Sequence, residues 1–117
     1  MDLFDTTQTG LERALTGASL RQQAIASNIA NVNTPGYRRE DVDFQSALQA
    51  AWGDEANVDR VQPAVGTDPS AQVRQDGSSV DIDVEAAAQA KNGLEYETIA
   101  QVIKTRTAII RSAIGIG

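Results

Sequence analysis

Clustered carboxylates are the residues of this sequence whose types and spacing come closest to a chemical site. Asp41 and Asp43 form one pair, and Asp81, Asp83 and Glu85 form a second group. Carboxylate oxygens are the ligands that Ca²⁺ prefers, and paired carboxyl groups can act as general acid and base. Neither group has the glycine and the spaced ligands of an EF-hand loop. Acidic residues at a helix start also have a capping role, so we expect no metal site.

Hydroxyl groups are abundant, but a nucleophilic hydroxyl needs a neighbouring base that takes its proton. Ser78 and Ser79 are candidates, yet the chain has no histidine and no cysteine, and its only lysines are Lys91 and Lys104. These absences remove imidazole bases, thiol chemistry and disulfides. We therefore predict a protein that is not an enzyme, with no catalytic residue and no cofactor.

Two arginines beside an aromatic residue form the only basic cluster of note. Arg38 and Arg39 follow Tyr37, but Glu40 and Asp41 come directly after them, and the net charge of the chain is −6. An acidic chain is a poor match for the phosphate backbone on which nucleic-acid affinity depends. We expect the arginines to reach acidic groups on the same or an adjacent chain, and we expect no nucleic-acid partner.

The negative charge is concentrated in the middle of the chain. Residues 1–34 carry two basic and three acidic residues, residues 35–83 carry four and ten, and residues 84–117 carry four and three. We divide the chain accordingly into an N-terminal helix (1–34), a turn motif with an irregular acidic middle segment (35–83), and a C-terminal helix (84–117). No apolar run reaches the ~20 residues that span a bilayer, and the first residues lack the pattern of a secretory signal peptide.

Apolar residues recur every seven positions in the first segment, which predicts an amphipathic helix that ends near Asn31. The residues of this face are Phe4, Leu11, Ala18, Ile25 and Val32, with Leu15 and Ile29 beside them. Gly10, Gly17 and Ala24 form a second strip with the same spacing. We interpret this strip either as a place where another backbone approaches closely or as an ordinary exposed face.

The end of this helix is marked by a turn sequence. Thr34-Pro35-Gly36-Tyr37 fits a type II turn, since proline fixes φ at the second position and glycine supplies a positive φ at the third. Thr34 is expected to be extended because it precedes proline. We predict that Asn31 or Asn33 takes a left-handed cap conformation.

The middle segment has weaker signals. Residues 40–51 fit a short strand or a helical turn, and residues 53–77 fit a loop or a mobile linker because they lack sustained periodicity. An extended piece over residues 80–84 is expected to lead into the second helix, with Asp81 or Asp83 as its N-cap. Asn92-Gly93 is expected to bend or loosen that helix.

The second helix has a broad apolar stripe, and its predicted length matches that of the first. The stripe contains Tyr96, Ile99, Ile103, Ile110 and Ala113, widened by Val102, Ile109 and Ile116. Helices of ~30 residues are ~45 Å long and can pair antiparallel. Since a broad stripe can contact several neighbours, we predict a mainly α fold whose long terminal helices pair as a coiled-coil-like bundle of several chains.

The run Ser-Asn-Ile-Ala-Asn-Val-Asn-Thr-Pro-Gly-Tyr-Arg at residues 27–38 closely resembles the N-terminal signature of the axial rod, hook and hook–filament junction proteins of the bacterial flagellum. Residues 39–44, 80–85 and 92–96 are similar to a proximal rod protein of that family. The resemblance implies a structural subunit that polymerises into a drive shaft and export channel. It assigns the turn to Asn28, Asn31, Asn33, Pro35, Gly36 and Tyr37. It assigns packing between subunits to Leu11, Leu15, Ile25, Ile29, Ile99, Ile103 and Ile110.

The same resemblance implies the partners and the location. The implied partners are copies of the chain itself, other rod proteins, the inner-membrane ring with its adaptor, and the flagellar type III export apparatus. The implied location is the periplasmic rod, which the chain would reach by export without a cleaved signal peptide. An uncleaved export segment would lie around Leu3-Phe4. Phe44 and Leu48 match a Phe-x-x-x-apolar gate-recognition element, or alternatively make two local core contacts. The rival function is a soluble helical-hairpin adaptor or an export-regulating binding module.

Overall fold

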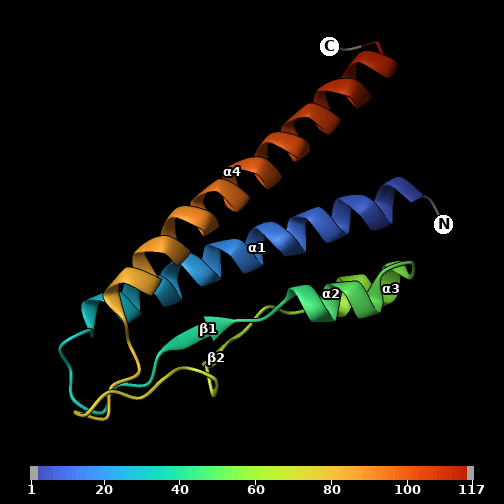
Figure 1. The fold of residues 1–117 in the computed structure, drawn as a ribbon. Coiled ribbons are helices and arrows are strands. Elements are labelled where there is room, and N and C mark those ends of the chain that lie inside the picture. The colour runs from blue at the N-terminus through green and yellow to red at the C-terminus, as the bar shows by residue number, and fades with distance from the viewer. Residues whose placement is uncertain (1–2, 116–117) are drawn as a thin grey trace.

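Two long helices at the ends of the chain dominate the structure, so the mainly helical prediction is confirmed (Figure 1). The computed structural model describes residues 3–115, without the side chains of residues 3–5 and 55, so the side chains of the predicted Leu3-Phe4 export segment lie outside its description. The elements are α1 (Leu3–Ala30), β1 (Glu40–Val42), α2 (Gln45–Ala51), α3 (Glu55–Arg60), β2 (Val65–Thr67) and α4 (Ile82–Ala113).

The helices α1 and α4 pair antiparallel, as predicted, where α1 ends and α4 begins. Figure 1 shows that they diverge from there, so that the C-terminal half of α4 projects away from α1. The molecule is therefore elongated, with extents of 61 × 27 × 14 Å. None of the helices within residues 3–115 combines the length and apolar character needed to cross a membrane.

The start of α4 shows how local capping overrides an alternating pattern. The Asp81 side chain accepts hydrogen bonds from the backbone N–H groups of Asp83, at 3.0 Å, and Val84, at 3.4 Å, so the N-cap prediction is confirmed. The predicted extended piece is too long, because Ile82 and Val84 already belong to the first helical turn. Both of these apolar side chains are exposed.

The predicted bend or loosening at Asn92-Gly93 does not interrupt α4, which is continuous through both residues. The buried Asn92 amide donates to the Ala18 carbonyl at 2.9 Å and to the Gln22 side-chain oxygen at 3.0 Å, both on α1. Contact with α1 therefore holds the helix together at a residue pair with poor helix propensity. The same hydrogen bonds fix the register of the two helices.

The turn after α1 is type II as predicted. The Tyr37 N–H donates to the Thr34 carbonyl at 3.2 Å, and Gly36 has a φ of +76°. The predicted left-handed asparagine cap is wrong, since no described residue other than glycine has a positive φ. The helix end is instead closed by the Asn31 side chain, whose amide donates to the Ser27 carbonyl at 2.8 Å.

The middle segment is more ordered than the sequence indicates. Residues 53–77, expected to be a loop, contain α3 and β2, and β2 pairs antiparallel with β1 in the register Glu40 to Thr67 and Val42 to Val65. The loop prediction is wrong at α3 and β2, because each of these elements is too short to show a periodic pattern. The middle segment is stabilised by contacts with α1. The buried Val42 and Phe44 pack beside this helix and form the core.

The glycine strip of α1 is a site of close approach, although aromatic rings, and not a second helix backbone, occupy it. A Cβ atom at Gly17 would lie 2.5 Å from Cε1 of Phe44, and one at Gly10 would lie 3.0 Å from Cη2 of Trp52. Both distances are shorter than van der Waals contact allows. The middle segment is therefore held against α1 by two rings that only glycine can accommodate.

We expect Gly17→Ala to lower the free energy of unfolding by about 1–3 kcal/mol, because the added methyl group overpacks against Phe44. Gly93→Ala is the matched control, since its Cβ would meet no other side chain or segment within 4 Å. In the interior of α4 it should raise stability by about 0.5–1 kcal/mol through helix propensity. Urea unfolding followed by circular dichroism measures both, and equal effects of the two substitutions would contradict the close approach.

Candidate functional site: a polar junction between α1, β1 and α4

The side chain of Asn28 acts as a strand partner for β1. Its Nδ2 donates to the carbonyl of Glu40 at 2.9 Å, and its Oδ1 accepts from the Glu40 N–H at 2.8 Å. A carboxamide can make this pair of bonds because it carries a donor and an acceptor side by side. Asn28 is fully buried, so the last turn of α1 is joined directly to the edge of the small sheet.

Tyr37 closes the turn motif onto the same asparagine. Its hydroxyl donates to Asn28 Oδ1 at 3.2 Å and lies 3.0 Å from Ser27 Oγ. The structure thus brings Asn28 and Tyr37 together, whereas Asn33, Pro35 and Gly36 are exposed. The Gly36 N–H donates to the carbonyl of Asp76 at 2.9 Å, which ties the turn to the segment that precedes α4.

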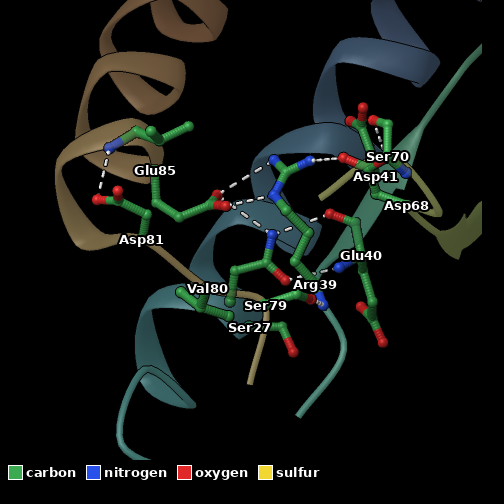
Figure 2. A network of polar contacts seen from close by, with 12 residues as sticks. Ser27, Arg39, Glu40, Asp41, Asp68, Ser70, Ser79, Val80, Asp81 and Glu85 are labelled. Carbon is green, nitrogen blue, oxygen red and sulfur yellow. Dashed lines mark hydrogen bonds and ion pairs between the residues drawn. The ribbon is translucent and has the colours of Figure 1, made fainter. Parts of the chain in front are cut away.

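Arg39 connects the turn to α4 through a buried ion pair (Figure 2). Its Nε donates to Glu85 Oε1 at 2.5 Å, and its Nη1 donates to Asp68 Oδ2 at 2.6 Å. The exposed fraction of Glu85 is 0%, and its second oxygen accepts from Asn28 Nδ2 at 3.2 Å. The hydrogen bond to Glu85, reinforced by that to Asp68, raises the pKa of Arg39 above its ordinary value against the opposing effect of burial.

Main-chain hydrogen bonds reinforce these contacts. The Arg39 N–H donates to Ser79 Oγ at 2.7 Å, and the Ser79 N–H donates to the carbonyl of Tyr37 at 2.9 Å. The Asp68 N–H donates to the carbonyl of Arg39 at 3.0 Å. We call Asn28, Arg39, Asp68, Ser79 and Glu85 the Arg39 junction, because they join the ends of α1, β1, β2 and α4.

The Arg39 junction is built to hold segments together, since its charged groups bond to one another. Asp81 is used as a helix cap, and Asp41 lies 3.5 Å from Nε of Arg21. Among the described residues there is no group of three or more histidine, cysteine, aspartate or glutamate side chains that could hold a metal ion. The Arg39 junction therefore fixes the direction of α4 relative to α1.

Acid should weaken the junction through Asp68. Hydrogen bonds from Ser70, and then the contact with Arg39, lower the pKa of Asp68 below its ordinary value of 3.8. A lowered pKa means that the carboxylate contributes stability above 3.8, and that this contribution disappears as the pH falls through the folded-state pKa. We expect Asp68→Asn to have a shallower loss of stability below pH 3.8 than the unmodified chain, measured by urea unfolding across that range.

The predicted packing residues occupy three different environments. Ile25 is buried, whereas Ile110 is 45% exposed. The remaining five are partly buried: Leu11, Leu15, Ile29, Ile99 and Ile103. The predicted export residues pack against α1, with Phe44 only 3% exposed in the core and Leu48 partly buried beside it.

Sequence reasoning anticipates that an arginine after the turn pairs with acidic groups, but it does not identify the acids. Glu85 lies 46 residues from Arg39, and Asp68 lies 29 residues away. In the sequence, Glu85 is an acidic residue in the first turn of a helix. Capping and the helix dipole already explain an acidic residue at such a position. No signal in the sequence distinguishes it as a buried ion-pair partner.

The turn region also carries the similarity to known proteins. Residues 11–38 match the family model described as "Flagella basal body rod protein". The chain is 32% identical to the flagellar basal body rod protein FlgB of Bacillus subtilis, over 86% of this chain and 87% of that protein. It is 30% identical to FlgB of Escherichia coli, over 83% and 84%, and 30% identical to FlgB of Borrelia hermsii, over 87% and 90%. With this identity over most of its length, the chain belongs to the FlgB family of flagellar basal-body rod proteins.

Proposed function

We propose that this chain is a structural subunit of the flagellar basal-body rod and that its long helices are its contacts with neighbouring subunits. The observation that carries the proposal is the row of exposed apolar side chains on the C-terminal half of α4. It comprises Val102, Ile109 and Ile110, followed by Ile114 at the C-cap of the helix. Burying one such side chain is worth ~1.5–3 kcal/mol, so this half of α4 gains stability when other helices cover it.

The divergence of the helices favours this function over a soluble hairpin adaptor. In a closed hairpin, α1 would cover the apolar stripe of α4 along its whole length. Here α4 diverges from α1 beyond the end that the two helices share (Figure 1). Ile110 is exposed although it lies on the same helix face as the partly buried Ile99 and Ile103. An uncovered stripe suits a subunit that is completed by its neighbours.

The Arg39 junction has a defined role in this proposal. It sets the angle between α1 and α4, so that every subunit presents its helices to its neighbours in the same way. The turn residues Asn28, Asn31, Asn33, Pro35, Gly36 and Tyr37 shape this joint. Packing between subunits is assigned to both helices through Leu11, Leu15, Ile29, Ile99, Ile103 and Ile110, whereas the buried Ile25 packs within the chain.

Membership of the rod family supports the partners and the location that we propose. The subunit assembles in the periplasmic rod with its own copies, with other rod proteins, and with the inner-membrane ring and its adaptor. It reaches that place through the flagellar type III export apparatus without a cleaved signal peptide. Phe44 and Leu48 serve as the gate-recognition element before folding, because burial of Phe44 in the folded chain would hide it.

A complementation experiment tests this function. In a strain that lacks the gene for this protein, the unmodified chain should restore swimming and be found in isolated basal bodies. Ile110→Asp should be exported to the same extent but should give no complete rods, because a charge would replace an apolar contact. Ser112→Asp, at an exposed polar position of the same helix, is the control and should restore swimming. Normal swimming with Ile110→Asp would contradict burial there, and absence of the unmodified chain from basal bodies would contradict the rod function.

A further inference from the structure

An apolar groove runs between α4 and the start of α2. Its volume is about 550 Å³, and its apolar lining includes Ala14, Phe44, Leu48, Leu94 and Ile99, together with Thr98. Leu94 is 66% exposed on the α4 side, and Phe44 with Leu48 forms the opposite wall. Lys91 and Glu95 also line the groove and offset each other in charge. The groove can therefore accept an apolar helix surface.

The end of α4 presents a surface of the matching kind. We call Ile109, Ile110, Ala113 and Ile114 the α4 tip; all four side chains are exposed. Their spacing places them on adjoining faces of the last two turns. The α4 tip is short enough to enter a groove of this size and apolar enough to gain by it.

The α4 tip and the segment that carries α2 differ in the sign of their charge, although the groove lining itself is balanced by Lys91 and Glu95. From residue 98 onward the only charged residues are basic, namely Lys104, Arg106 and Arg111. Residues 40–59, which include α2 beside the groove, carry six acidic residues and no basic one. These are Glu40, Asp41, Asp43, Asp54, Glu55 and Asp59. Asp41 and Asp59 are paired with Arg21 and Arg13 of α1, so the other four carry the excess negative charge. Opposite charges of this kind steer encounter and fix register more than they add affinity.

We infer that the α4 tip of a second copy of this chain docks in the groove between α2 and α4. This inference rests on the proposed rod function and specifies one of its contacts. The groove lies along the middle of α4 and the tip at its far end, on a molecule 61 Å long, so the two copies use different surfaces. Such a heterologous contact repeats from copy to copy, and it produces a helical array where the rotation between copies does not close into a ring. The α4 tip of the second copy fills the groove, and the groove in turn covers the exposed isoleucines of that tip.

Disulfide cross-linking tests the contact, because the chain has no cysteine of its own. Thr98→Cys places a thiol in the groove, and Ala113→Cys places one on the α4 tip; both are small changes that keep the apolar side chains. The matched control is Tyr96→Cys, which lies on a separate groove of α4 lined by Ser19 and Gln22. A disulfide forms only when the two Cα atoms come within ~4.4–6.8 Å.

Cells that make two differently tagged single-cysteine variants supply the basal bodies, which are then oxidised. We expect the T98C and A113C pair to give several-fold more linked dimer than the Y96C and A113C pair. Leu94→Cys is a second groove position should Thr98→Cys alter folding, and it should give the same preference. If the chain is present in the basal bodies but the groove pair does not exceed the control, or only A113C pairs with itself, the docking is overturned and the rod function stands. If the unmodified chain is absent from basal bodies, the rod function fails as well.

Discussion

Arg39→Gln should lower the free energy of unfolding by about 3–5 kcal/mol, because it leaves Glu85 as a buried carboxylate without its counter-ion. The remaining hydrogen bond to Glu85, from Asn28 at 3.2 Å, comes from a neutral amide and cannot replace the lost charge. Glutamine keeps a polar group of similar reach, so the expected loss reports mainly the missing charge. Urea unfolding of the purified chain, followed by circular dichroism, measures it.

Arg38→Gln is the matched control for this prediction. Arg38 is the preceding residue and its side chain is exposed, so its replacement should change stability by no more than about 0.5 kcal/mol. Glu85→Gln should cost less than Arg39→Gln, because Arg39 keeps the Asp68 carboxylate as a partner. Similar small losses for Arg38→Gln and Arg39→Gln would show that the ion pair does not hold the junction.

Phe44→Ala should also lower the free energy of unfolding by about 3–5 kcal/mol, as expected for truncation of a buried aromatic side chain. The Phe44 ring fills the space above Gly17, and glycine has no side chain with which to close the cavity that alanine would leave. The substitution also removes a contact with the Arg21 guanidinium, whose carbon lies 5.0 Å from the ring centroid. The same unfolding measurement applies.

A double-mutant cycle makes this second prediction specific to the pair. Gly17→Ala overpacks the site while Phe44 is present, but after Phe44→Ala its methyl group has room. We therefore expect Gly17→Ala to become neutral or stabilising in the Phe44→Ala background, with a coupling energy of about 1–3 kcal/mol. Trp52→Ala, at a ring that is 55% exposed, should cost less than Phe44→Ala. Additive effects of the Gly17 and Phe44 substitutions would argue against direct contact between these positions.

Local signals determined the elements that the sequence predicted correctly. The two long helices follow from apolar periodicity, the type II turn from Pro35-Gly36, and the start of α4 from the capping side chain of Asp81. Each of these features depends on residues that lie close together in the sequence. The glycines of α1 belong partly to this class: their spacing was compatible with a close approach of another backbone or with an exposed face, and it did not indicate that aromatic rings would pack there.

Contacts between distant residues decided the rest. Arg39 selects Glu85 and Asp68 only after folding has brought three segments together, and Asn28 becomes a strand partner only because β1 passes beside the end of α1. The sequence by itself determined where the two long helices lie and that the chain resembles the flagellar axial proteins. The tertiary structure alone decided how the helices are joined and which part of α4 stays exposed, because burial and long-range pairing depend on which segments meet in space and leave no periodic mark along the chain.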